Sequence, residues 1–167
     1  MKTRKICMIG DFAIGKTSLV GRFVRQAFGE QYLTTVGVKI DTRELSLPSG
    51  DELKLVLWDI AGKSALADID TNYLRDASGY LLVADGTRGE TLDSALTLHD
   101  TVRTRLGDVP FCLLLNKADL DAQWTVDRER LAALKAQSWP LRETSALSGD
   151  GVENAFIRLG QQLLHAV

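Results

Sequence analysis

The chain has 167 residues, of which 45% are hydrophobic and 25% are charged, and its formal net charge is −2. This length fits a single domain over residues 1–167, and the charge balance argues against a general nucleic-acid binder, which usually carries a basic surplus. The 2 cysteines are too few for a disulfide framework and fit a reducing compartment. No apolar run approaches the roughly 20 residues that a membrane-spanning helix needs. We therefore expect a cytoplasmic protein that does not bind nucleic acid.

In chain order, segments typical of strands alternate with segments typical of helices. The expected strands are 5–9, 38–47, 53–60, 79–84, 110–115 and 140–143. The expected helices are 15–27, 91–106, 127–136 and 151–164. Pro48 to Asp51 reads as a turn that folds the second and third strands into an antiparallel hairpin. The alternation predicts an α/β fold, with a mostly parallel six-stranded sheet, one antiparallel edge strand and helices on both faces.

Residues 10–17 read Gly-Asp-Phe-Ala-Ile-Gly-Lys-Thr and match the phosphate-binding pattern G-x-x-x-x-G-K-[ST]. They lie between an expected strand and an expected helix, so a chance glycine-rich turn is the weaker interpretation. Glycines let backbone N–H groups turn towards phosphate oxygens, and the helix N-terminus adds a positive dipole. Lys16 would reach the β- and γ-phosphates, and the Thr17 hydroxyl would ligate Mg²⁺. The residues predicted to bind phosphate are Gly10, Ala13, Ile14, Gly15, Lys16, Thr17 and Ser18.

Asp59 ends the expected strand that follows the hairpin turn, and Ile60, Ala61 and Gly62 come directly after it. A lone aspartate at a strand end is usually a turn residue. Beside a phosphate-binding loop, however, such a carboxylate would hold Mg²⁺ through a water molecule. Asp59 is therefore the second predicted metal ligand, after Thr17.

Two later segments fit the recognition of a guanine base. Residues 116–119 read Asn-Lys-Ala-Asp, and Asp119 can accept hydrogen bonds from guanine N1–H and the 2-amino group. Adenine offers neither donor at these positions, so this carboxylate would select guanine. Asn116 would hold the loop and approach N7, and the stem of Lys117 can lie over the base. Residues 144–147 read Thr-Ser-Ala-Leu, and the Ala146 N–H would face guanine O6, with Ser145 and Leu147 on either side.

With these motifs in this order, the sequence resembles the small GTPases of the Ras superfamily, most like the Rab and Rho branches, over nearly its whole length. Residues 32–37 (Tyr-Leu-Thr-Thr-Val-Gly) are similar to the Rab switch I, and residues 58–62 (Trp-Asp-Ile-Ala-Gly) are similar to the Trp-Asp-Thr-Ala-Gly motif. The resemblance implies a P-loop G domain that binds GTP and GDP with Mg²⁺. Its switch I would span about 28–38 and its switch II about 59–73.

The same resemblance implies roles for four more residues. Thr35 would ligate Mg²⁺ and touch the γ-phosphate, and the Gly62 N–H would contact the same phosphate. Phe28 would pack edge-on against guanine, and Tyr32 would lie over the phosphates. The protein would then act as a two-state switch, because GTP draws in Thr35 and Gly62 and GDP lets them relax. Its partners would be effector proteins that read the switches, with activating and exchange factors.

Three positions depart from the family, and they concern hydrolysis of GTP rather than binding. Lys63 stands where the family has the glutamine that orients the attacking water, and an ammonium donates hydrogen bonds but cannot accept them. Phe12 stands where the family has a small residue and would crowd the γ-phosphate, and Ile60 replaces a threonine. Three interpretations of Lys63 stay open. It is a solvated switch residue and intrinsic hydrolysis is very slow, or it supplies a positive charge to the transition state in place of the glutamine. Alternatively, a partner protein brings the residue that orients the water. The expected catalytic set is Lys16, Thr35, Gly62 and Lys63.

Two rival interpretations stay open at this point. Phe12 and Lys63 favour an essentially non-hydrolysing module that stays bound to GTP and serves as a scaffold. A P-loop ATPase or small-molecule kinase is disfavoured by the guanine-reading segment 116–119. The chain ends in Leu-His-Ala-Val, without the cysteine-bearing tail of lipidated Rab and Rho proteins, so we expect no direct membrane anchor.

Overall fold

The computed structural model describes residues 1–11, 13–24, 31–33, 38–60 and 71–165. The described strands are β1 (Lys2–Gly10), β2 (Gln31–Leu33), β3 (Lys39–Ser46), β4 (Glu52–Asp59), β5 (Gly79–Asp85), β6 (Phe111–Asn116) and β7 (Leu141–Glu143). The described α-helices are α1 (Lys16–Val24), α2 (Glu90–Leu106), α3 (Arg128–Ala136) and α4 (Val152–His165). Short 3₁₀ helices occupy η1 (Thr71–Leu74) and η2 (Ala118–Gln123).

The strands form one sheet in the order β2-β3-β4-β1-β5-β6-β7. Strand β1 lies in the middle and pairs in parallel with both β4 and β5, and the parallel pairing continues through β6 to β7. Strands β3 and β4 form the expected antiparallel hairpin, closed by a 2.8 Å hydrogen bond from the Leu47 N–H to the Asp51 carbonyl. The predicted fold class is confirmed. The structure adds β2, a seventh strand at the edge that pairs antiparallel with β3.

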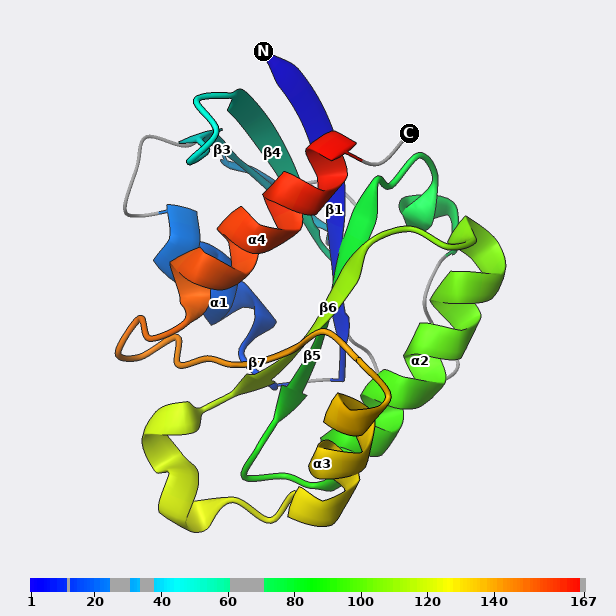
Figure 1. Ribbon diagram of the computed structural model, residues 1–167, viewed down its shortest axis with the longest axis vertical. Coiled ribbons are helices and arrows are strands. Elements are labelled where there is room, and N and C mark those ends of the chain that lie inside the picture. The colour runs from blue at the N-terminus through cyan, green and yellow to red at the C-terminus, as the bar shows by residue number, and fades with distance from the viewer. Residues whose placement is uncertain (12, 25–30, 34–37, 61–70, 166–167) are drawn as a thin grey trace.

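Helices cover both faces of the sheet, with α1 and α4 on one face and α2 and α3 on the other (Figure 1). Helix α4 forms against the sheet because its apolar residues recur every three or four positions and make one buried stripe. That stripe consists of Val152, Ala155, Phe156, Leu159 and Leu163. The Phe156 ring stacks on Phe23 of α1, with ring centroids 4.0 Å apart and planes 8° from parallel. The two helices therefore share one core on this face.

Arg43 of β3 joins the same two helices from the side of the sheet. It is buried, lies over the Phe23 ring at 4.3 Å, and donates from Nη1 to the Phe23 carbonyl at 3.0 Å. Its other terminal nitrogen forms an ion pair with Glu153 of α4. These contacts use the charge and the planar guanidinium of Arg43 together. Arg43 thus connects β3 to both helices of this face.

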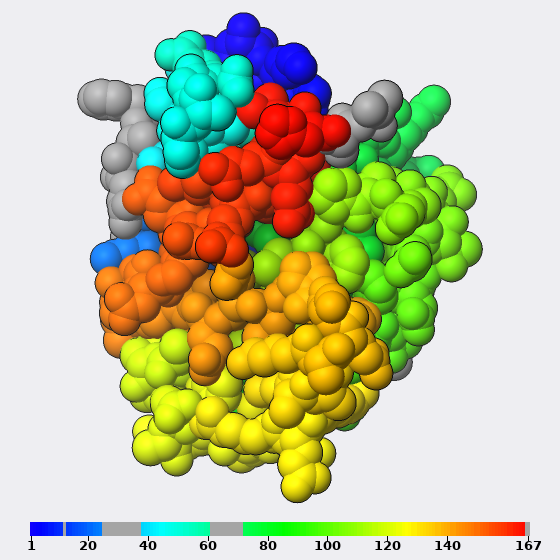
Figure 2. Space-filling view, in the orientation of Figure 1, coloured from blue at the N-terminus to red at the C-terminus, as the bar shows by residue number. Residues whose placement is uncertain are grey.

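The carboxyl ends of β1, β4, β5 and β6 lie along one edge of the sheet, at Gly10, Asp59, Asp85 and Asn116. Figure 2 shows α4 across the upper part of one face and the segment with η2 and α3, in yellow, at the lower end. Within the described residues, no helix is long and apolar enough to cross a membrane.

Candidate nucleotide-binding site

The loop between β1 and α1 is shaped by two residues with positive φ angles. Ala13 has a φ of 56° and Gly15 a φ of 95°. A Cβ atom added to Gly15 would come within 2.3 Å of Asn116 Nδ2, so glycine is required here by both conformation and space. This loop is the predicted phosphate-binding segment: Gly10 ends β1, Ala13, Ile14 and Gly15 lie in the loop, and Ser18 lies in the first turn of α1.

Lys16 is the first residue of α1 and is only 7% exposed. Its Nζ donates to the carbonyl oxygens of Gly10, at 3.2 Å, and Ile60, at 2.9 Å. Burial lowers the pKa of Lys16, while Asp59 and Asp11 nearby act to raise it. A buried ammonium held at a helix N-terminus is well placed to meet an anion, which would compensate its loss of hydration.

Thr17 and Asp59 come together where α1 begins and β4 ends. The Thr17 hydroxyl donates to Asp59 Oδ2 at 2.5 Å, and Asp59 is 5% exposed. Hydroxyl and carboxylate oxygens are the hard donors that Mg²⁺ prefers. The pair predicted from the sequence is therefore brought together, and its chemistry fits that ion.

Asn116, at the end of β6, connects the phosphate loop to the segments predicted to read the base. Its Nδ2 donates to the Ile14 carbonyl at 3.0 Å. Its Oδ1 accepts from the Thr144 hydroxyl at 3.4 Å and from the Ala146 N–H at 3.3 Å. The Ala146 N–H, expected to face guanine O6, is thus bonded to Asn116 in this structure. One buried amide side chain holds three loops that are distant in the sequence.

The other predicted base-reading residues lie around Asn116. The Ser145 hydroxyl donates to Asp119 Oδ1 at 2.7 Å, and Asp119 itself is exposed. The Lys117 ammonium lies 2.8 Å from Asp85 Oδ2, and its carbonyl accepts from Trp124 Nε1 at 2.9 Å. Leu147 is 78% exposed at the tip of its loop.

Sequence reasoning missed two side chains that hold these loops. Asp85 pairs with Lys117, and Arg22 of α1 donates to the Leu147 and Ser148 carbonyls at 3.4 and 3.0 Å. Arg22 carried one weak signal, as a basic residue in the last turn of its helix. Asp85 carried another, as an acidic residue directly after an apolar strand.

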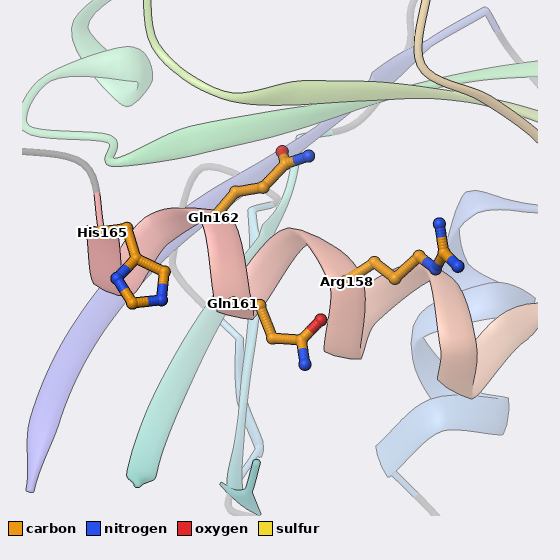
Figure 3. Close-up of a pocket in the computed structure, with 4 residues that line it drawn as sticks. All are labelled: Arg158, Gln161, Gln162 and His165. Atoms are coloured by element: carbon orange, nitrogen blue, oxygen red, sulfur yellow. The ribbon is translucent and has the colours of Figure 1, made fainter. Parts of the chain in front are cut away.

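Several predicted site residues lie outside the part of the chain that the structure describes. They are Phe12, Phe28, Thr35, Gly62, Lys63 and the side chain of Tyr32. The pocket in Figure 3 is a different place: Arg158, Gln161, Gln162 and His165 line it, all on α4.

The parallel sheet with a phosphate loop at the end of its central strand defines a P-loop nucleotide-binding protein. The model of the Ras family matches residues 5–165 of this chain. The chain is 34% identical over 163 residues to the Ras-related protein Rab-8B of Pongo abelii, covering 96% of this chain and 78% of that protein. It is 33% identical over 158 residues to the Ras-related protein SEC4 of Saccharomyces cerevisiae, covering 94% and 73%. It is also 35% identical over 165 residues to the Ras-related protein Rab11E of Lotus japonicus, covering 98% and 75%.

The chain therefore belongs to the Ras family of small GTPases and is Rab-like, as its motifs predicted.

Proposed function

We propose that this protein is a molecular switch that binds GTP and GDP with Mg²⁺, hydrolyses GTP slowly, and signals through residues 28–38 and 59–73. The 3.0 Å hydrogen bond from Asn116 Nδ2 to the Ile14 carbonyl carries the proposal. It joins the predicted base-reading segment directly to the predicted phosphate loop, so one nucleotide could contact both. Membership of the Ras family supports the same conclusion.

At the phosphate end, Lys16 meets the β- and γ-phosphates, and the backbone from Gly10 to Ser18 surrounds their oxygens. Thr17 and Asp59, with Thr35 of switch I, would hold Mg²⁺, and the ion would supply positive charge that neutralises the phosphates. The 2.5 Å contact between Thr17 and Asp59 supports this role, because it already places two hard oxygen donors together.

At the base end, Asp119 accepts from N1–H and the 2-amino group of guanine. The Ser145 hydroxyl, 2.7 Å from Asp119 Oδ1, keeps the carboxylate in one orientation. Asn116, Ala146 and Leu147 border the base from the neighbouring loops, and the stem of Lys117 lies against its face. Phe28 and Tyr32 complete the pocket from switch I.

The switch itself depends on Thr35 and Gly62, which contact the γ-phosphate only in the GTP state. Effector proteins bind the switches in that state, and activating and exchange factors act on the same regions. The link from Lys16 Nζ to the Ile60 carbonyl supports coupling to switch II, because Ile60 lies directly before residues 61–70.

Hydrolysis is slow because Lys63 cannot accept a hydrogen bond from the attacking water as glutamine does. Phe12 adds bulk beside the γ-phosphate. These two residues also favour a second candidate, an essentially non-hydrolysing module that stays bound to GTP as a scaffold. Single-turnover GTP hydrolysis by Lys63→Gln shows which role Lys63 has. A faster rate identifies Lys63 as the defect, and a slower rate identifies it as a catalytic cation.

The first test is to denature the purified protein and identify the released nucleotide by chromatography. Guanine nucleotide is the expected result. Mostly GDP indicates unaided turnover, and mostly GTP favours the scaffold. Adenine nucleotide would overturn the proposal. Asp119→Ala provides the matched test in solution, because it should weaken GDP binding and reduce the preference for GDP over ADP.

A further inference from the structure

We propose that Asp85 is a positioning residue of the guanine site, whose buried carboxylate holds Lys117 in place beneath the base. This inference rests on the proposed function. It adds to the base-reading segment 116–119 a residue from a different strand. The observation behind it is the ion pair between Asp85 Oδ2 and Lys117 Nζ, at 2.8 Å.

The Asp85 carboxylate is held in one position by the sheet and by side-chain contacts, although it is charged. It ends β5 and pairs in the sheet with Asn116, the residue directly before Lys117. Its side chain is 0% exposed, and Oδ1 accepts both the N–H and the hydroxyl of Thr87, at 2.8 and 2.7 Å. A buried carboxylate is tolerated when all its oxygens meet donors. Here Thr87 satisfies one oxygen, and Lys117 is the cation that faces the other.

The carboxylate is charged at neutral pH. Burial alone would raise the pKa of Asp85, but the contacts with Lys117 and Thr87 outweigh burial and bring the pKa below its ordinary value. Asp85 therefore presents a full negative charge to Lys117 throughout the physiological range.

Lys117 is fixed at both ends. Its backbone has a φ of 69°, in the left-handed region, and its carbonyl accepts from Trp124 Nε1 at 2.9 Å. Its ammonium is held by Asp85, although the side chain is still 35% exposed. A free lysine side chain loses about 2 kcal/mol of rotamer entropy when it is ordered. Because the fold has already ordered this stem, the nucleotide does not meet that cost on binding.

The segment after Asp85 reinforces this arrangement. Gly86 lies against the Trp124 ring, where an added Cβ would come within 2.1 Å of a ring carbon, and its N–H donates to the Asn116 carbonyl at 3.1 Å. These contacts use backbone and an uncharged ring, so they survive loss of the Asp85 charge. Removing that charge should therefore alter Lys117 without dismantling the loop. Figure 1 shows this connection from β5 to α2 beside α3.

The test is the dissociation rate of a fluorescent GDP analogue from the full chain, chased with excess GDP in Mg²⁺. Asp85→Asn keeps the shape and the acceptor for Thr87 but removes the charge. We expect dissociation about tenfold faster, because removing one charge of an ion pair at a buried carboxylate leaves the Lys117 ammonium without its counter-charge. Asp121→Asn is the matched control: Asp121 forms an ion pair with Arg128 at 2.7 Å, but its side chain is 63% exposed. Exposed pairs contribute little, so this variant should stay within about twofold of wild type.

A double-mutant cycle with Lys117→Gln distinguishes positioning from a general structural role. In the Lys117→Gln background, Asp85→Asn should add no further acceleration. Equal acceleration in both backgrounds would overturn the proposal, as would an unchanged rate for Asp85→Asn alone. If Asp85→Asn does not fold, Thr87→Ala replaces it, because it removes one bond that orients the carboxylate. Wild-type protein that fails to bind the GDP analogue would instead refute the proposed function.

Discussion

Arg22 donates a 3.0 Å hydrogen bond from Nη2 to the carbonyl oxygen of Ser148. The helix that begins at the phosphate loop thus also holds the loop that follows β7. A further bond from Nη1 reaches the Leu147 carbonyl at 3.4 Å, and Gly149 lies against the guanidinium. The segments predicted to bind phosphate and to read the base are therefore connected through α1 as well as through Asn116.

Replacing Arg22 should loosen the loop at the base end. Arg22→Ala is expected to speed GDP dissociation several-fold, because it removes hydrogen bonds from a charged group. Arg22→Lys should recover part of the effect, because lysine can reach one carbonyl but lacks the planar fork. Arg158→Ala, on the exposed face of α4, is the control. An unchanged dissociation rate in Arg22→Ala would show that this clamp does not matter for the nucleotide.

Gly15→Ala should abolish nucleotide binding. The new methyl group would need a φ of 95° and would lie 2.3 Å from Asn116 Nδ2, which would push Asn116 away from the Ile14 carbonyl. We expect affinity for GDP to fall by at least about 100-fold, measured by titration with the fluorescent analogue. Gly50→Ala is a matched control, because Gly50 has a φ of 89° but has no atom within 4 Å of an added Cβ. It should lose about 1–2 kcal/mol of stability and still bind GDP. Normal binding by Gly15→Ala would refute the steric argument.

The buried histidine on α2 should make stability depend on pH. His99 Nδ1 forms a 2.9 Å hydrogen bond with the Tyr80 hydroxyl, and burial raises the pKa of Tyr80 to about 12, so the phenol keeps its proton. Burial also lowers the pKa of His99, with Arg103 acting in the same direction and Asp100 opposing it. The folded state thus holds His99 neutral at a pH where the unfolded chain already takes up a proton.

Above about pH 6.5 neither the folded nor the unfolded state protonates this histidine, and below this pH the unfolded state binds the extra proton. The free energy of unfolding should therefore fall as pH drops from 7 towards 5, by up to about 1.4 kcal/mol per pH unit. Urea titrations across this range should show a smaller slope for His99→Gln, whose amide can still accept from Tyr80. An unaltered slope in His99→Gln would contradict the assignment.

The stacked pair Phe23 and Phe156 should carry a large share of the stability of its face of the sheet. Both rings are 0% exposed. Phe156→Ala removes a buried ring and leaves a cavity, which costs about 3–5 kcal/mol. Phe156→Leu should cost less, because it keeps most of the volume. Thermal unfolding monitored by circular dichroism measures both. A loss below about 1 kcal/mol for Phe156→Ala would mean that the core can close around the gap.

The sequence predicted the elements that carry their own local pattern. The hairpin of β3 and β4 follows from alternating residues around a turn, and the phosphate loop follows from its glycines and Lys16. Strand β2 was not predicted, because Gln31–Leu33 is too short to show a period and is a strand only through its pairing with β3. Helix η2 reads as a loop, since Ala118–Gln123 has no apolar face and no buried residue.

The contacts of Arg22 and Asp85 could not be predicted for a different reason. Each joins segments that meet only when the sheet has formed, so nothing near them in the sequence indicates the partner. Asp119 and Asn116 were predicted because their chemistry also suits a ligand, whereas the only contacts described for Arg22 and Asp85 are with other protein groups. The sequence therefore predicted candidate ligand contacts from their motifs and did not indicate the residues that hold those segments together.

The ammonium of Lys16 has only three protons to share. Two of them are given to the carbonyl oxygens of Gly10 and Ile60. If Lys16 donates to both the β- and the γ-phosphate, at most one proton remains for the two carbonyl oxygens. At least one of the bonds to Gly10 and Ile60 must then break. GDP has no γ-phosphate and would accept fewer hydrogen bonds from the same nitrogen. In the proposed switch, the number of terminal phosphates would therefore decide whether Lys16 keeps its hydrogen bond to the Ile60 carbonyl, at the start of switch II.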